Sequence, residues 1–422
     1  MGRAAGPRGP DVTGPAELRE QLVRQLQADG TLSDERIAAA LREVPRHAFL
    51  PGVELERAYR DDAVVTKTGA DDRAISSSSQ PAIMALMLAQ LGVEPGHRVL
   101  EIGAGTGYNA ALLARLAGPA GQVTTVDLDE DTAAAARAHL DGCGFGAVRV
   151  IAADGWLGWP QDAPYDRIIL AVGAWDIAPA WIEQLRQGGR LVLPLSLRPG
   201  TQYSVAFDRA ADQLASVSVI PCGFMTLRGP FAGPELAVRL ADGSGVTAEV
   251  AVRPDGAEPV ADLLAQPGAD VTAGITVTTR DLWAGLGLWL AAAEPAMGRL
   301  SSFGGAARPG VAGPIPAGWA GTGLLAGAHG CAALVAMAGG DAAGPFELGV
   351  RPFGADGAAL AARLVRLARG WAEAGRPSPA ELRISASPFG KKIFPGEGET
   401  VIEKEQTRLL LRWVPREAGG GP

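Results

Sequence analysis

Short apolar runs separated by helical stretches dominate the chain between Val99 and Asp208. The runs are rich in β-branched residues and read HRVLEIG, QVTTVDL, VRVIAAD, YDRIILAV, GGRLVLPL and QYSVAFD. Strands that alternate with Ala- and Leu-rich helices form βαβ units, in which helices cover both faces of a parallel sheet. The pattern therefore predicts an α/β fold with a mostly parallel sheet.

The flanking regions have different patterns. Two short helices are predicted at Glu17–Ala28 and Asp34–Val44, with Ser33 as the N-cap of the second. Beyond about Leu227 the alternation stops, and a separate α+β region is predicted. Its expected elements are two strands around an Asp-Gly turn within 235–254, a long loop at 304–321, an amphipathic helix at 356–375, and strands at 381–387 and 408–414.

These patterns divide the chain into four predicted parts. They are a flexible leader at residues 1–15, an α/β domain at 16–230, a C-terminal α+β domain for substrate recognition at 231–417, and a flexible tail at 418–422. The length of 422 residues agrees with two or three domains.

Composition excludes several classes of protein. With 47% hydrophobic and 20% charged residues, the chain is not mostly disordered. A net charge of −8 without a dense basic stripe argues against a nucleic-acid partner. The longest apolar run, Trp283–Ala293, is too short to cross a membrane. The three cysteines form no CxxC pair, so we expect no zinc site and no disulfide framework, which fits a cytoplasmic location.

A glycine-rich turn follows the first strand of the α/β domain. Its G-x-G-x-G spacing allows close backbone approach to a ligand and differs from the G-x-G-x-x-G of dinucleotide enzymes. A helix is expected to begin near Tyr108 and to present free N–H groups. The acidic residue before the glycines suits the cationic amino-acid end of S-adenosylmethionine, directly or through water. The residues assigned to this turn are Glu101, Gly103, Ala104, Gly105 and Gly107.

Two further carboxylates follow the next two strands. Asp127, followed by Leu128, ends the second strand, where its oxygens can accept both ribose hydroxyls of a nucleoside. Asp154, followed by Gly155, comes after the third strand and is expected near the adenine. Aspartates at strand ends are commonly turn or helix caps. Three such features on consecutive βα units nevertheless favour S-adenosylmethionine as the cofactor.

Several separated motifs agree with one known family. They are VPRHAFLP (44–51), AYRDDAV (58–64), SQPAIMALML (79–88), LEIGAGTGYNAALLA (100–114), ADGWLGWPQDAPYDRII (153–169), IAPAWIEQLRQGGRLVLPL (177–195) and CGFMTLRG (222–229). On these motifs the chain from about residue 41 to 233 resembles the protein-L-isoaspartate O-methyltransferases.

The resemblance implies a fold and a reaction. The fold is that of class I S-adenosylmethionine-dependent methyltransferases, Rossmann-like, with an N-terminal helical cap over the ligand. The reaction is methyl transfer to the side-chain carboxylate of an aspartyl or isoaspartyl residue, which leaves S-adenosylhomocysteine. A carboxyl group with a pKa of about 4 is already ionised at neutral pH, so the site needs no general base. We expect no metal.

A run of serines carries the acceptor part of the resemblance. The family has a Thr-Ile-Ser-x-Pro segment, and alignment on the Pro places serines at all three of its first positions. Serine in place of the branched Ile predicts a more polar and roomier acceptor pocket, although a flexible serine linker is the alternative. The resemblance implies Ser77, Ser78 and Ser79 as catalytic residues and Ser76, Gln80, Val172 and Gly173 as substrate-binding residues.

The length of the chain suggests a more specific role. Repair enzymes of this family end soon after the CGFMTLRG motif, whereas nearly half of this chain remains. In this the chain resembles enlarged relatives that modify ribosomally made peptides in lanthipeptide and graspetide pathways. We therefore expect methylation of an Asp in a cyclised or modified precursor peptide, leading to aspartimide or isoaspartate. General isoaspartate repair and a non-catalytic binding protein are the alternatives, and the oligomeric state stays open.

Overall fold

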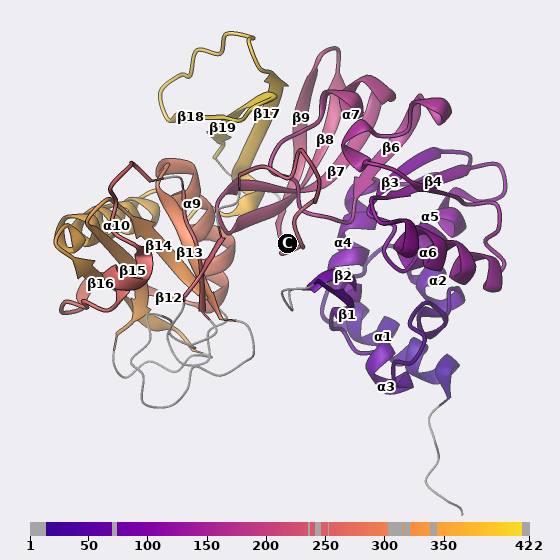
Figure 1. The fold of residues 1–422 in the computed structure, drawn as a ribbon, viewed down its shortest axis with the longest axis horizontal. Helices are drawn as coiled ribbons and strands as arrows, with labels where there is room; N and C mark the ends of the chain where they lie inside the picture. Colours follow the sequence, from indigo (N-terminus) through magenta and orange to yellow (C-terminus); the bar gives the residue numbers. More distant parts are fainter. Residues whose placement is uncertain are drawn as a thin grey trace, which may run out of the picture. The chain divides into compact units, whose positions relative to one another are not determined.

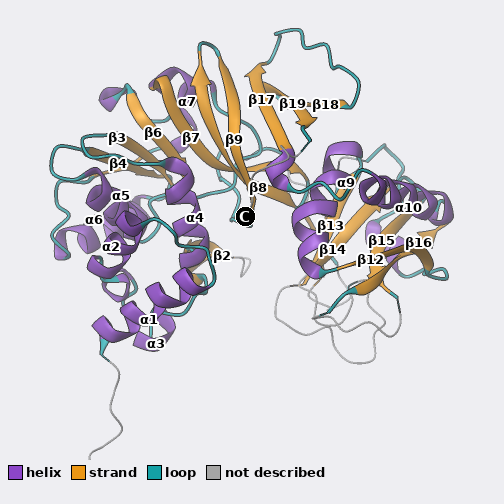
Figure 2. Cartoon of the chain, turned by 180° about the vertical axis from the view of Figure 1, so that it is seen from behind, coloured by secondary structure: helices purple, strands orange, loops and turns teal. Residues whose placement is uncertain are grey.

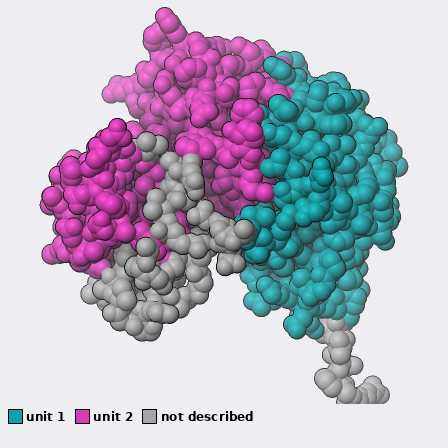
Figure 3. Space-filling view, viewed as in Figure 1, with its two compact units in different colours: residues 1–171, 183–192 teal, residues 172–182, 193–422 magenta. Residues whose placement is uncertain are grey.

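The computed structural model describes residues 14–69, 74–234, 237–240, 246–251, 253–302, 315, 321–337 and 344–415. Most of the predicted leader, the predicted Asp-Gly turn, most of the predicted loop at 304–321 and the predicted tail lie outside these residues. Two compact units make up the chain (Figure 3). The first comprises residues 1–171 and 183–192, and the second comprises residues 172–182 and 193–422.

The predicted parallel sheet lies in the first unit. β3 pairs with β4 and with β6, β4 pairs with β5, and β6 pairs with β7, all in parallel. In the order β7-β6-β3-β4-β5, β4 and β5 follow on one side of β3, and β6 and β7 follow on its other side. The strand order therefore reverses between β3 and β6, and doubly wound sheets bind their ligands at such a point. The strands are β3 (Arg98–Ile102), β4 (Gln122–Asp127), β5 (Arg149–Ala152), β6 (Tyr165–Leu170) and β7 (Leu185–Arg198).

Helices connect these strands, as the alternating pattern predicts (Figures 1 and 2). α5 packs against β3 and β4, and α6 packs against β4 and β5. Short 3-10 turns, η2 (Gly155–Leu157) and η3 (Pro160–Asp162), precede β6. α4 (Pro81–Leu91) precedes β3, α5 (Tyr108–Ala117) connects β3 to β4, α6 (Glu130–Gly142) connects β4 to β5, and α7 (Pro179–Gln184) precedes β7.

The first unit also contains an N-terminal layer of helices, in which α2 contacts α4 and α5. The two predicted helices are present as α1 (Pro15–Ala28) and α2 (Glu35–Glu43). The predicted N-cap Ser33 is wrong by one residue, because the side chain of Asp34 accepts hydrogen bonds from the N–H groups of Arg36 and Ile37. The layer continues through η1 (Arg46–Phe49), α3 (Leu55–Ala58) and an antiparallel hairpin of β1 (Val64–Thr68) and β2 (Ala74–Ser78).

The second unit contains two antiparallel arrangements. After β7 the order continues as β8-β9-β17-β19-β18, while β10-β11-β13-β14-β15-β16-β12 forms a separate sheet whose apolar face packs on α8 and α10. The elements are β8 (Thr201–Ala210), β9 (Gln213–Pro221), β10 (Ala237–Arg239), β11 (Val246–Glu249), α8 (Val260–Leu264), β12 (Val271–Val277), η4 (Asp281–Leu286), α9 (Gly287–Ala293), β13 (Met297–Ser302), β14 (Gly321–Ala326), β15 (Gly330–Ala336), β16 (Phe346–Gly354), α10 (Gly357–Glu373), η5 (Pro379–Glu381), β17 (Leu382–Pro388), β18 (Glu399–Glu403) and β19 (Thr407–Trp413).

The compact units do not coincide with the predicted boundary between residues 230 and 231. β17, which lies beyond that boundary in sequence, pairs with β9, as the register Ser385 to Ala215 shows. The last three strands therefore extend the sheet that begins in the first half of the chain. The predicted amphipathic helix and the two predicted C-terminal strands are present as α10, β17 and β19. Among the described helices, none is long and apolar enough to cross a lipid bilayer.

Candidate active site

The glycine turn joins β3 to α5 and is fixed to the neighbouring strand. The N–H groups of Gly103 and Ala104 donate to the carbonyl of Val126 at 2.8 and 3.2 Å. Gly105 and Gly107 have positive φ angles of 52° and 86°, which glycine adopts without strain. The turn thus brings the start of α5 to the carboxyl end of β4.

Asp127 lies at the turn. Its Oδ2 accepts a hydrogen bond from the N–H of Gly105 at 3.0 Å, and its Oδ1 accepts one from the N–H of Asp129 at 3.2 Å. Leu128, the next residue, is 39% exposed. The predicted ribose carboxylate and the glycine turn are therefore in direct contact, although the chain separates them by 22 residues.

Glu101 lies beneath the turn and is fully buried. Its Oε1 accepts from the side-chain amide of Asn109 at 2.7 Å, and its Oε2 accepts from the hydroxyl of Thr125 at 2.6 Å. Burial raises the pKa of Glu101 from its ordinary value of 4.5 to about 7, the two hydrogen bonds oppose this, and the charge of Asp127 adds to it. The carboxylate is thus held by α5 and β4, and any contact with a cofactor stays a prediction.

Asp154 has a local structural role. Its side chain accepts from the N–H of Trp156 at 2.9 Å and so caps η2. The next position favours glycine, because a Cβ on Gly155 would lie 2.4 Å from Cγ2 of Ile102 at the end of β3. These contacts hold the segment after β5 against β3, while the predicted adenine contact stays a prediction.

Ser76, Ser77 and Ser78 form the end of β2, which lies beside the glycine turn. A Cβ built on Gly105 would lie 3.5 Å from the carbonyl oxygen of Ser77. Ser78 is 3% exposed, and its hydroxyl has no hydrogen-bond partner among the described residues. Ser79 is half-buried and leads directly into α4. The run is thus a strand held against the turn, which contradicts the alternative of a flexible linker.

Three of the sequence motifs converge on the end of this strand. Arg46, from VPRHAFLP, is fully buried and donates to the carbonyls of Ala58 and Ser79 at 3.0 and 2.9 Å. Asp61, from AYRDDAV, accepts from the side chain of Gln80 and from the N–H of Ala82, both at 2.8 Å. Gln80, predicted to bind substrate, thus holds Asp61. The motifs act together to fix the junction between β2 and α4.

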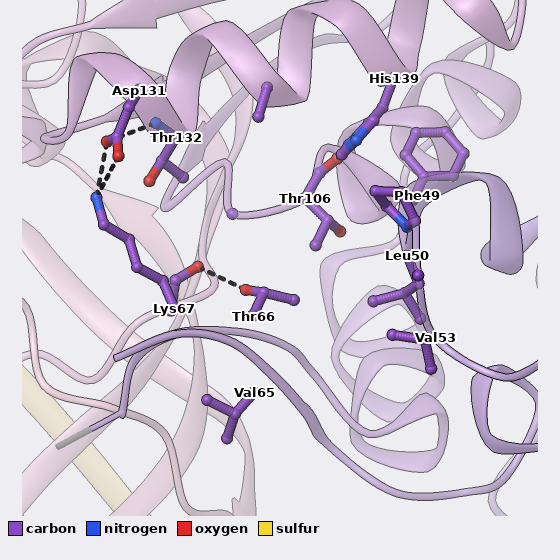
Figure 4. Close-up of a pocket in the computed structure, with 15 residues that line it drawn as sticks. Phe49, Leu50, Val53, Val65, Thr66, Lys67, Thr106, Asp131, Thr132 and His139 are labelled. Carbon is purple, nitrogen blue, oxygen red and sulfur yellow. Dashed lines mark hydrogen bonds and ion pairs between the residues drawn. The ribbon is translucent and has the colours of Figure 1, made fainter. Parts of the chain in front are cut away.

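A cavity of about 470 Å³ lies beside the turn and the serine strand. In Figure 4, Lys67 contacts Asp131 on one side of it, while Phe49 and His139 lie on the other. The Nζ of Lys67 lies 2.7 Å from Asp131 and 3.0 Å from Asp129. The remaining lining comes from 50–53, 65–66, Ser76, Gly105, Thr106, Thr132 and Ala135.

Comparison with known proteins identifies the family. The model of the family described as "Protein-L-isoaspartate(D-aspartate) O-methyltransferase (PCMT)" matches residues 17–230. A protein-L-isoaspartate O-methyltransferase of Methanopyrus kandleri is 40% identical over 181 residues, which are 43% of this chain and 77% of the relative. Protein-L-isoaspartate O-methyltransferase 1 of Rhodopseudomonas palustris is 39% identical over 228 residues, which are 52% of this chain and 89% of the relative.

The chain belongs to this family. It is an S-adenosylmethionine-dependent protein carboxyl O-methyltransferase with the class I methyltransferase fold, as predicted. Among solved structures, one titled protein-L-isoaspartate O-methyltransferase is similar with a TM-score of 0.49 and 24% identity, covering 87% of this chain and 96% of that one.

The described residues fit the cofactor of this family. The Asp127 carboxylate, oriented by Gly105, offers acceptors for the ribose hydroxyls of S-adenosylmethionine at the end of β4. The positive φ angles around Gly105 let backbone approach the ligand without a side chain between them. Among the described residues, no group of three or more His, Cys, Asp or Glu is placed to hold a metal ion.

The structure also shows what sequence reasoning missed. Arg46 and Asp61 lie inside two of the motifs, and this position is the signal that could have found them. Arg46 is buried and Asp61 is half-buried, and both bind the junction between β2 and α4. Lys67 lies in none of the motifs, and no local sequence pattern indicates its place beside the cavity. Val172 and Gly173 follow β6 and lie in the second compact unit, so their predicted contact with the substrate stays a prediction.

Proposed function

We propose that this protein methylates the free carboxylate of isoaspartyl residues in peptides or proteins. Membership of the family supports this substrate class. The observation that carries it is the close approach of the serine strand to the glycine turn, where a Cβ on Gly105 would lie 3.5 Å from the carbonyl oxygen of Ser77. An acceptor held by the strand would therefore lie next to the cofactor turn.

The residues of the chain account for binding and alignment. Bound S-adenosylmethionine supplies a methyl group on a sulfonium, and transfer to the carboxylate oxygen leaves the neutral thioether S-adenosylhomocysteine. Asp127 binds the ribose hydroxyls of S-adenosylmethionine beside the glycine turn. The hydroxyls of Ser78 and Ser79 donate hydrogen bonds to the acceptor carboxylate. Holding both reactants in line provides most of the rate acceleration for such a transfer. Because the acceptor is already ionised, no side chain has to remove a proton.

A second candidate is methylation of one chosen Asp in a ribosomally made, modified peptide. Ser78 supports it, because this residue stands where the resemblance places a branched apolar residue and its buried hydroxyl has no hydrogen-bond partner among the described residues. A buried hydroxyl without a partner is unfavourable, so a bound carboxylate or amide would satisfy it. The comparisons favour isoaspartate methylation over this more specific role.

Mass spectrometry with matched peptides distinguishes these functions. The wild-type protein with S-adenosylmethionine is incubated with an isoaspartyl peptide, with the same peptide carrying ordinary Asp, and with a cyclised Asp peptide. Methylation of the isoaspartyl peptide alone supports the first function. Preference for the cyclised Asp peptide supports the second, and no methyl transfer to any peptide contradicts both.

Two substitutions test the assigned roles. Asp127→Ala removes the ribose acceptor and is expected to weaken cofactor binding by about 1 to 3 kcal/mol, measured by isothermal titration. Asp141→Ala, which removes an exposed carboxylate paired with Arg137, is the control and should leave the affinity unchanged. Ser79→Ala should slow methyl transfer at unchanged cofactor affinity. An equal loss of affinity in the Ser79 variant would contradict its place on the acceptor side.

A further inference from the structure

The turn between β18 and β19 carries a buried lysine. Lys404 is 5% exposed, and its Nζ donates to the carbonyls of Ser196 and Leu197 on β7 at 2.8 and 3.3 Å. The same nitrogen lies 3.2 Å from the centre of the Trp175 ring. An ammonium group has three donors, so the two carbonyls and the ring face together occupy its surroundings.

The residue next to Trp175 binds the same turn. Asp176 is 3% exposed, and its Oδ1 accepts from the hydroxyl of Thr407 at 2.5 Å, while its Oδ2 accepts from the N–H of Gln406 at 2.6 Å. Lys404 and Asp176 therefore connect two consecutive residues of one loop to one hairpin turn that lies about 230 residues later in the chain.

This loop follows the strand beside the glycine turn. At the end of β6, the N–H of Ala171 donates to the carbonyl of Ile102, the last residue of β3. Val172 and Gly173 come next. In doubly wound sheets, the loops after these strands contact the ligand. The loop from Val172 to Asp176 thus follows directly on the carboxyl end of β6, and its last residue binds the C-terminal hairpin.

Gly173 is held from the other side. Its N–H donates to the carbonyl of Met225 at 2.8 Å, and its carbonyl accepts from Leu227 at 2.7 Å. A Cβ on Gly173 would lie 2.0 Å from Nε2 of Gln202, so a larger residue here would have to displace the Gln202 side chain. The loop consequently has two fixed ends, one at residues 225–227 of the family region and one at Lys404.

We propose that Lys404 and Asp176 are positioning residues, which set the conformation of the loop at 172–176 and, through it, the affinity for the isoaspartyl peptide. The proposal rests on the proposed function. It gives the hairpin of β18 and β19 a role in substrate affinity without contact to the reacting atoms. The two carbonyls of β7 and the ring of Trp175 hold the Lys404 nitrogen in a fixed position.

Kinetics of Lys404→Met test the proposal. Methionine keeps an unbranched apolar side chain that is one atom shorter, and it removes the donors to β7. The KM for an isoaspartyl peptide is expected to rise about tenfold, while kcat and the cofactor dissociation constant each change less than twofold. Lys391→Met, which removes an exposed lysine paired with Asp212, is the matched control and should leave all three values unchanged. An unchanged KM, or equal changes in KM and cofactor affinity, would overturn the proposal.

A second measurement does not depend on activity. Hydrogen exchange followed by mass spectrometry should become faster in peptides covering 172–177 of Lys404→Met and of Asp176→Asn, but not in peptides covering the glycine turn. Unchanged exchange at 172–177 would also overturn the proposal. Wild-type protein that binds S-adenosylmethionine but methylates no isoaspartyl peptide would contradict the proposed function alone, because the exchange result would still report on the link between Lys404 and the loop.

Discussion

Glu101 in the first unit and Lys404 in the second are both buried ionisable groups, yet their surroundings differ. The donors to Glu101 are side chains of α5 and β4, whereas the acceptors of Lys404 are backbone carbonyls of β7. Burial raises the pKa of Glu101 to about 7 and lowers the pKa of Lys404 to about 7. The same physical cause therefore acts on the two groups with opposite sign.

The two groups also differ in how far along the chain their hydrogen-bond partners lie. The partners of Glu101, Asn109 and Thr125, lie 8 and 24 residues away, within one βαβ unit. The carbonyls bound by Lys404 lie 207 and 208 residues away. Glu101 thus stabilises a local turn, and Lys404 joins two distant segments of the chain.

The largest expected effect is a loss of stability on removal of the Glu101 carboxylate, which should exceed the loss on removal of the Lys404 amine. Glu101→Ala should lower the free energy of unfolding by about 3 kcal/mol, because two buried donors lose their acceptor and a cavity remains. Lys404→Ala should lower it by less, because unpaired carbonyls are less unfavourable than unpaired donors and a buried charge is removed. Urea unfolding at neutral pH measures both.

An exposed carboxylate provides the control for this comparison. Glu43 pairs with Arg115 with half of its side chain exposed, so Glu43→Ala should change the free energy of unfolding by less than about 1 kcal/mol. A loss in Lys404→Ala equal to that in Glu101→Ala would show that the distant link is as important for folding as the local turn.

A smaller effect follows from the opposite pKa shifts. The folded state holds the Glu101 proton more tightly than the unfolded state does, so raising the pH from about 5 to 7 should reduce the stability of wild type relative to Glu101→Gln by about 2 kcal/mol. The folded state holds the Lys404 proton less tightly, so raising the pH from about 7 to 9 should increase stability relative to Lys404→Met by about 2 kcal/mol.

Urea unfolding at a series of pH values measures these slopes. The differences between wild type and each variant matter, because every other titrating group cancels in them. Parallel curves for wild type and Glu101→Gln would mean that Glu101 keeps an ordinary pKa in the folded protein. Slopes of the same sign for both pairs would refute the opposite action of burial on the two groups.

The contrast between Glu101 and Lys404 also explains which features sequence reasoning found. The parallel strands and the glycine turn follow from local patterns of apolar and glycine residues. The structure adds that the N–H of Gly105 donates to Asp127, while the contact of both residues with the cofactor stays a prediction. The N-cap was misplaced because Ser33 and Asp34 are adjacent and both residue types cap helices.

Other features depend on contacts between distant residues. No local pattern indicates that Arg46 binds the carbonyl of Ser79, that β17 pairs with β9, or that Lys404 lies on Trp175. Each contact is decided by tertiary packing, in which a polar group is buried only after its partner arrives from far along the chain. Local patterns therefore indicate the strands and the glycine turn better than the distant contacts that support the serine strand.

The smallest expected effect concerns cofactor affinity and asks whether Glu101 acts on the ligand. A cationic amino group bound near Glu101 favours the ionised carboxylate, so binding below pH 7 requires loss of the proton that burial stabilises. The dissociation constant for S-adenosylmethionine should therefore fall about tenfold between pH 5.5 and 7, measured by isothermal titration. Glu101→Gln cannot ionise and should bind equally over this range, whatever its absolute affinity. A flat profile in wild type would mean that Glu101 stays protonated in the complex and only supports the turn, whereas equal slopes in both proteins would assign the titration to another group.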